Sequence, residues 1–116
     1  MSFTVTKTKI TLTKGDTFSL PVHFHQPITG AVITIRLHQK NKITPVIEKL
    51  ISTHTAPAEG KSILLLEKEL TDTLLEGSYP IEMFITFSDG NKYTFYPPQP
   101  DLTAELVIKN PVLKEV

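Results

Sequence analysis

The residues of this 116-residue chain with the clearest capacity for chemistry are two histidines, His23 and His25. They lie two positions apart in an alternating segment, so both imidazoles face the same side of a predicted strand. Two such imidazoles can ligate a metal ion if a third ligand approaches. His38 and His54 are isolated, and nothing else lies at ligand spacing. We therefore favour a solvent-facing pair, and His23 and His25 stay only as candidate metal ligands.

Other arrangements of polar residues have simpler structural interpretations. Asp89 to Asn91 offers two oxygen-bearing side chains before Lys92, which fits a hairpin turn better than a calcium loop. Lys14 to Thr17 has one glycine and no following helix, so it is not a phosphate loop. Glu67 and Glu69 are expected to share an exposed strand face. No nucleophile-elbow or zincin motif is present. We predict no catalytic residue, no cofactor and no enzyme activity.

Four aromatic side chains raise the question of a sugar-binding surface, since aromatic rings stack on apolar faces of ligands. Tyr79, Tyr93, Phe95 and Tyr96 are the candidates, and the chain has no tryptophan. Phe95 is expected to pack in the core. Tyr79 follows Gly77 at the start of a strand, where a tyrosine often ties down the corner of a sandwich. For both Phe95 and Tyr79, a structural role is favoured over sugar binding.

Composition narrows the classes of partner. Twelve basic and twelve acidic residues give no net charge, so no broad field attracts nucleic acid or an anionic membrane. The absence of cysteine excludes disulfides and thiol chemistry. The longest aliphatic run, Ile63 to Leu66, is too short to span a bilayer, and the N-terminus lacks the pattern of a signal peptide. We expect neither nucleic acid nor membrane as a partner.

The segment from Tyr79 to Ile108 predicts three strands. Ile81, Met83, Ile85 and Phe87 alternate with Glu82, Phe84, Thr86 and Ser88. Asp89-Gly90-Asn91 then provides a turn, and residues 93–96 run back. Prolines at 97, 98 and 100 then interrupt the chain. Residues 102–108 alternate again. This pattern of short strands and turns continues along the chain and is typical of an all-β sandwich or barrel.

The remaining segments predict further strands and little helix. Residues 18–24 alternate, with Pro21 indicating an edge position. A change of parity around Lys7 to Lys9 predicts a bulge or a switch between sheets. Ser62 to Leu66 is apolar on both faces and predicts a central strand covered on both sides. Thr71 to Gly77 is the one helical candidate, of a single turn at most.

The sequence also resembles small immunoglobulin-like (Ig-like) β-sandwich proteins of tailed phages and prophages. It looks most like the N-terminal domain of phage baseplate upper proteins. The segments that carry the resemblance, in order, are Lys14 to Leu20, Ile28 to Ala31 with Arg36 further along the same strand, Leu70 to Asp72, Glu76 to Tyr79 and Phe87 to Gly90. The ordered set spans about residues 9 to 109, although each piece alone is generic turn chemistry.

The resemblance implies an all-β, Ig-like antiparallel β-sandwich of two sheets and about seven to nine strands. We assign it to residues 1–109, with 110–116 as a C-terminal tail or linker. The expected core comprises Phe18, Leu20, Val22, Ile33, Ile35, Leu65, Ile81, Met83, Ile85, Leu106 and Ile108. The strand around Pro21 and the C-terminal strand are the expected free edges.

The function that the resemblance implies is structural. The protein would be a non-enzymatic component of a phage or prophage particle, associated with the baseplate or tail, and synthesised in the bacterial cytoplasm before entering the virion. Its partners would be other tail, baseplate or capsid proteins, and it could form a homo-oligomer. Baseplate upper proteins continue into further domains, so this chain corresponds to their attachment module or to a free-standing small virion protein. The alternative is a bacterial surface or adhesin-type β-sandwich module that binds glycan or protein.

Overall fold

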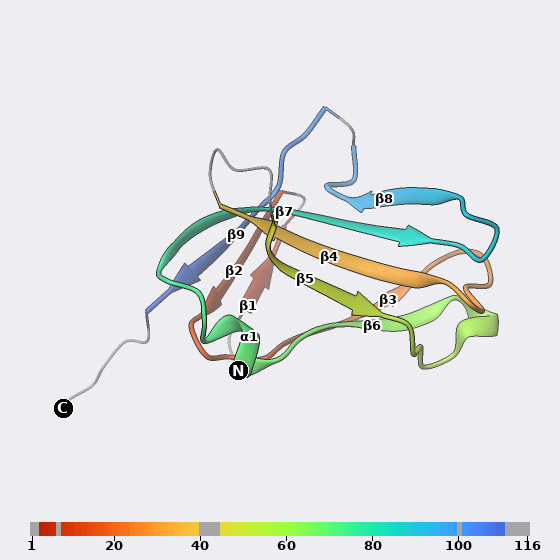
Figure 1. Cartoon of the computed structure of the whole chain (residues 1–116), viewed down its shortest axis with the longest axis horizontal. Helices are drawn as coiled ribbons and strands as arrows, with labels where there is room; N and C mark the ends of the chain where they lie inside the picture. The colour runs from red at the N-terminus through yellow and green to blue at the C-terminus, as the bar shows by residue number, and fades with distance from the viewer. Residues whose placement is uncertain (1–2, 7, 40–44, 100, 111–116) are drawn as a thin grey trace.

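A computed structural model describes residues 3–6, 8–39, 45–99 and 101–110. Within them, nine strands form two sheets that enclose one apolar core (Figure 1). The strands are β1 (Phe3–Val5), β2 (Lys9–Thr13), β3 (Phe18–His23), β4 (Val32–His38), β5 (Pro45–Ile51), β6 (Lys61–Leu66), β7 (Gly77–Thr86), β8 (Lys92–Tyr96) and β9 (Glu105–Lys109). The prediction of an all-β sandwich with two sheets is confirmed.

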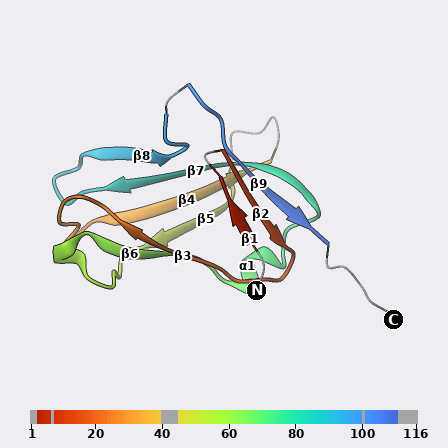
Figure 2. The same ribbon diagram turned by 180° about the vertical axis from the view of Figure 1, so that it is seen from behind.

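The two sheets are unequal in size. The larger has the order β1-β2-β9-β7-β4-β5, with β8 also paired to β7, and the smaller contains only β3 and β6. Seen from behind, β3 crosses in front of the larger sheet (Figure 2). One pair departs from the antiparallel expectation, because β2 and β9 run parallel, from Lys9 opposite Glu105 to Thr13 opposite Lys109. Strands so distant in sequence need no hairpin, so either direction is open to them.

The three strands predicted between Tyr79 and Ile108 are present, and the first begins at Gly77 rather than Tyr79. Both β8 and β9 pair antiparallel with β7, β8 along its C-terminal half and β9 along its N-terminal half. Together, β8 and β9 pair with successive parts of the same edge of β7. The proline-rich segment between them leaves the sheet, since proline cannot donate a ladder hydrogen bond.

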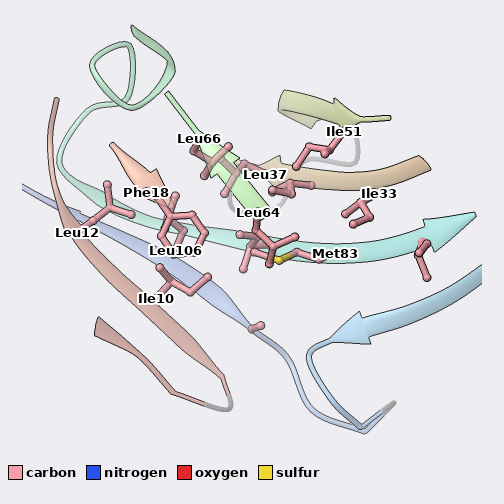
Figure 3. Close-up of a cluster of buried hydrophobic side chains, with 14 of the residues drawn as sticks. Ile10, Leu12, Phe18, Ile33, Leu37, Ile51, Leu64, Leu66, Met83 and Leu106 are labelled. Carbon is pink, nitrogen blue, oxygen red and sulfur yellow. The ribbon is translucent and has the colours of Figure 1, made fainter. Parts of the chain in front are cut away.

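The core contains most of the residues that alternation predicts (Figure 3). Leu20 and Val22 are only partly buried at its margin, and Leu65 is wrong, because Leu64 and Leu66 take the inward positions. The described core also includes side chains that the prediction omitted, namely Ile10, Leu12, Ile28, Ala31, Leu37, Ile51, Leu64, Leu66, Leu74 and Ala104. The wrong parity in β6 follows from a run that is apolar at every position from Ile63 to Leu66, so periodicity cannot choose its inner face.

β6 is not the central strand that we predicted. It pairs with β3 alone in the described part of the chain, and its burial alternates between Ser62, Leu64 and Leu66 inside and Ile63 and Leu65 outside. The edge position predicted for the strand around Pro21 is confirmed, since β3 also has one neighbour. The C-terminal strand was wrongly expected to be an edge, because β9 lies between β2 and β7.

The N-terminal segment forms a hairpin rather than a bulge or a switch between sheets. β1 pairs antiparallel with β2, with Val5 opposite Ile10, and the Thr6 amide donates to the Lys9 carbonyl over 2.8 Å. The Tyr96 hydroxyl donates to the Thr6 carbonyl at 3.0 Å, and burial raises the pKa of Tyr96 above its ordinary value. The change of parity therefore marks the turn of a hairpin within one sheet.

Helical structure is confined to two short turns among the described residues. α1 (Lys68–Thr71) ends where the predicted turn of Thr71 to Gly77 was to begin, so Thr71 is its last residue rather than its first. η1 (Pro57–Glu59) is a single 3-10 turn before β6. No helix of the described part has the length and apolar character needed to cross a membrane. Of the expected tail, Asn110 is described and donates to Glu76 at 3.0 Å; residues 111–116 lie outside the described ranges.

The sandwich corner predicted at Tyr79 is confirmed. Its hydroxyl donates to the Leu75 carbonyl at 2.7 Å, four residues upstream, while its ring packs against the core. Phe95 also packs against the core and meets Phe24 edge-on, with ring centroids 5.2 Å apart. Tyr93 is 55% exposed. Tyr96 also packs against the core, so three of the four aromatic side chains have structural roles.

We expect Tyr79→Phe to lower the free energy of unfolding by about 1 kcal/mol, the net worth of one intramolecular hydrogen bond. The ring and its packing stay, so only the bond to the Leu75 carbonyl is lost. Urea denaturation followed by circular dichroism measures the change. Tyr93→Phe, at an exposed ring, is the control and should leave the midpoint unchanged. If the two variants had equal effects, the hydrogen bond from Tyr79 to Leu75 would not stabilise the sandwich corner.

Candidate functional site

The two histidines proposed as candidate metal ligands lie together on the protein surface. The rings of His23 and His25 are 5.4 Å apart between centroids, and both residues are exposed at the end of β3. Across the described ranges, no group of three histidine, cysteine or acidic side chains has the arrangement to hold a metal ion. The structure thus brings the two imidazoles together without giving them a third ligand.

A hollow that we call the β5–β6 groove runs between the facing edges of the two sheets. Its volume is about 590 Å³. The lining residues are Ser19, Lys49, Leu50, Ile51, Ser52, Thr53, His54, Thr55, Ile63 and Leu65. Leu50 is 61% exposed and Ile63 37% exposed. Exposed aliphatic side chains gathered at a groove are typical of a protein contact surface.

The edge of β6 at this groove carries unpaired backbone groups. The amide and the carbonyl of Lys61 both bond to Ala56, at 3.0 and 3.2 Å, on the side of β6 away from β3. In a strand, the amide and carbonyl of every second residue point to the same side. The backbone groups of Ile63 and Leu65 therefore point toward this same edge. The ladder begun by Ala56 is open beyond Lys61, which makes β6 a free template for another strand.

A salt bridge joins the two sheets at one end of the β5–β6 groove. Lys49 lies opposite buried Ile35 on β4, so this lysine is on the inward side of an edge strand. Its Nζ lies 2.9 Å from Oε1 of Glu67, just after β6. The hydrogen bond from Lys49 is the main cause that lowers the pKa of Glu67 below 4.5. An inward charge on an edge strand also discourages uncontrolled pairing of that edge.

We expect the protein to lose stability in acid partly through Glu67. Its pKa is lowered in the folded state, so its contribution is present above about pH 4.5 and disappears as the pH falls through the lowered value. The variant Glu67→Gln should therefore show a shallower loss of thermal stability below that pH than the parent. Melting temperatures between about pH 3 and 7 test this. Glu69→Gln on α1 is the control, and equal pH profiles for parent and Glu67→Gln would contradict the coupling.

A histidine joins the sheets at the other end of the groove. His54 Nε2 lies 2.8 Å from the Ala31 carbonyl, and Nδ1 lies 2.8 Å from Oγ of Ser62. Since a carbonyl only accepts, Nε2 must carry a proton, and in the neutral ring Nδ1 accepts from Ser62. His54, which had no role in the sequence analysis, thus connects the start of β4 to β6. Its spacing from Ala31 and Ser62 contains no signal that could have predicted this.

Glu67 and Glu69 do not share a strand face as predicted. Glu67 precedes α1 and pairs with Lys49, whereas Glu69 is exposed on the helix. Arg36 lies on the outer face of the larger sheet and forms a salt bridge with Glu48. Its guanidinium lies 5.0 Å from the Phe84 ring centroid. Glu67 and Arg36 are therefore each paired with an oppositely charged neighbour.

Segments that carry the family resemblance meet in space although they are far apart in sequence. Lys14 Nζ donates to the carbonyls of Asp72 and Leu74 at 2.7 and 2.8 Å. The hydroxyl of buried Thr71 donates to the Asp16 carbonyl at 2.7 Å. The segment from Lys14 to Leu20 is therefore fixed to α1 and the residues just after it by three hydrogen bonds. Each was predicted only as a local turn, so this pairing was not expected.

Comparison with known proteins does not assign the chain to a family: no model of a known protein family matches the sequence, and no curated protein matches it.

Proposed function

We propose that the protein is a non-enzymatic structural component of a phage or prophage particle, associated with its baseplate or tail. It acts by docking on a neighbouring protein of the particle, and the β5–β6 groove is the docking surface. The observation that carries this proposal is the groove itself, where exposed Leu50 and Ile63 lie beside an open backbone ladder on β6. Such a surface suits binding to protein better than chemistry on a small molecule.

The resemblance to baseplate proteins gains support from the way its segments pack. Lys14 donates hydrogen bonds to the carbonyls of Asp72 and Leu74, just after α1. Gly30, in the Ile28 to Ala31 segment, lies against Ser88, in the Phe87 to Gly90 segment; a Cβ on Gly30 would lie 3.5 Å from the Ser88 Cβ. Four of the motif segments therefore form two contacts that stabilise one sandwich. This agreement favours a shared framework.

The test is whether the protein belongs to purified particles. The prophage of the strain that carries the gene is induced, particles are banded in a density gradient, and peptides of this chain are quantified by mass spectrometry. We expect the chain in the particle band in a fixed ratio to tail proteins. Its absence from the particles, with particles otherwise complete, would overturn the proposal. Display on the cell surface would instead favour the adhesin-type alternative.

A matched pair of variants tests the groove as the docking surface. Leu50→Lys places a charge on the 61% exposed wall of the groove, and Leu75→Lys places the same charge at a 75% exposed position that does not line the groove. We expect Leu50→Lys to reduce incorporation into particles about tenfold or more, since desolvating a charge in an interface costs more than one hydrogen bond. Leu75→Lys should be incorporated like the parent. Equal incorporation of both variants would exclude the groove.

A further inference from the structure

The two exposed histidines at the end of β3 have the spacing of a metal chelate. The ring centroids of His23 and His25 are 5.4 Å apart, and the ring planes are inclined at 49°, so the rings are not stacked on each other. Zn–N bonds of about 2.0–2.1 Å at the tetrahedral angle place the centres of two ligating imidazoles about 5.2 Å apart. Small rotations of the two side chains therefore allow both to ligate one zinc ion.

The residue between the two histidines holds them in this position. Phe24 packs against the core and meets Phe95 edge-on. Its amide donates to the Gly60 carbonyl at 2.7 Å. Because successive side chains of an extended segment point to opposite sides, the inward position of Phe24 directs both imidazoles outward. Ligands that are already in place lose less conformational freedom when the metal binds.

The lysine beside the pair has its charge balanced by a neighbour. Lys61 lies opposite His23 in the β3–β6 ladder, and its Nζ is 3.3 Å from Oε1 of Glu59. An isolated ammonium group at this position would repel a divalent cation, whereas an ion pair carries no net charge. The surroundings of the two imidazoles on β6 are therefore compatible with a bound metal ion.

One chain supplies only half of a zinc coordination shell. Structural zinc sites are almost always tetrahedral with four ligands, yet no group of three histidine, cysteine or acidic side chains in the described ranges can hold a metal ion. A second copy offers the same two imidazoles. Gln26 and Pro27, which follow the pair, are exposed as well, so the pair lies on an open surface. A two-fold axis through the metal would complete the shell with identical ligands from two equal copies.

We propose that His23 and His25 bind a zinc ion together with the same two residues of a second copy, so that zinc joins two chains into a dimer. Imidazole also suits copper and nickel, and zinc is chosen as the probe because it takes tetrahedral geometry without redox chemistry. Neither histidine lines the β5–β6 groove. The dimer therefore leaves the groove open, and the zinc site does not depend on the proposed function.

The experiment is sedimentation velocity on the full chain, purified without a histidine tag, at about 100 µM protein with and without zinc chloride. We expect zinc to convert the monomer into a dimer that holds one metal ion per two chains, and EDTA to reverse the conversion. Zinc bound by each chain without dimerisation would overturn the bridge between copies. Absence of zinc binding at this concentration would overturn the site itself.

Single substitutions assign the ligands. His23→Gln and His25→Gln should each abolish the zinc-dependent dimer, because each removes one ligand from both copies. Both positions are exposed, so both variants should melt like the parent by circular dichroism. His38→Gln is the control, since Nε2 of His38 lies 3.6 Å from Oε2 of Glu82 on the larger sheet, and it should dimerise like the parent. Equal dimerisation of all three variants would overturn the assignment.

Nuclear magnetic resonance of the imidazole groups gives a second readout that does not depend on dimerisation. Zinc should shift the ring signals of His23 and His25 and leave those of His38 and His54 unchanged. Signals of His38 or His54 that moved instead would place the metal elsewhere and overturn the proposal. Both measurements use the isolated chain, so their failure is distinct from absence of the chain from purified particles.

Discussion

Gly60→Ala is expected to destabilise the domain by about 3–5 kcal/mol, through a steric clash added to an unfavourable backbone conformation. Gly60 has a φ of +77°, and a Cβ there would lie 2.2 Å from the Phe24 carbonyl oxygen and 2.5 Å from that of Gln26. The neighbours cannot retreat freely, because the Phe24 amide donates to the Gly60 carbonyl at 2.7 Å. Guanidinium denaturation measures the loss, which is a large part of the stability of a small domain.

Gly90→Ala separates the two causes. Gly90 also has a positive φ, +93°, but a Cβ added there would have no neighbouring atom within 4 Å. This control should cost only about 1–2 kcal/mol, the penalty of a left-handed conformation for alanine. If both variants lost the same stability, the close contact of Gly60 with Phe24 and Gln26 would have no energetic weight. The difference between them is the quantity that tests the packing of the loop against β3.

Ile85→Asp is expected to unfold the domain, because it places an unpaired carboxylate in the core at a cost of about 4 kcal/mol or more. Ile85 is 2% exposed and lies between Ile33 on β4 and Tyr93 on β8. The loss of a cooperative thermal transition, followed by near-ultraviolet circular dichroism, is the expected observation. A melt within a few degrees of the parent would mean that the assigned register of β7 is wrong.

The neighbouring position gives a control for that register. Thr86 is half-buried, follows Ile85 on β7 and lies opposite Lys92. Successive side chains of a strand point to opposite faces, so Thr86→Asp puts its carboxylate outside the core and close to a lysine. We expect its melting temperature to stay within a few degrees of the parent. Two adjacent aspartates with opposite outcomes would confirm the alternation directly.

The fold could be predicted where alternation is clean and fails where it is not. Ile81, Met83 and Ile85 alternate with Glu82 and Phe84, and the first three lie in the core as predicted. Ser62 to Leu66 is apolar on both faces, so the sequence suited a central strand and hid the fact that β6 is an edge. Hydrophobicity indicates that burial of a side chain is favourable. It does not indicate whether that side chain is buried by its own chain or by a partner.

The candidate site was less predictable because its parts meet through tertiary structure. Lys49 reaches Glu67 and His54 reaches Ala31 and Ser62 only after β5 and β6 have been placed beside each other. Sequence spacing contains no trace of these distances. The two histidines that were singled out, His23 and His25, do lie together, His23 as the last residue of β3 and His25 two residues beyond it. Local periodicity could therefore predict their proximity, but it could not indicate the groove.

The position of β9 has a consequence for how the chain acquires its shape during synthesis. β9 is the last of the nine described strands in chain order, yet it lies in the interior of the larger sheet between β2 and β7. Until it emerges from the ribosome, the hairpin of β1 and β2 has no strand to join to the β7 side. The nascent chain therefore has two unpaired strand edges, one on β2 and one on β7. Pairing of β9 with β2 then brings together segments from near the two ends of the chain, and closing so long a loop slows folding. A stop codon before Glu105 would thus divide the sheet in its middle, whereas loss of β1 would trim only its margin.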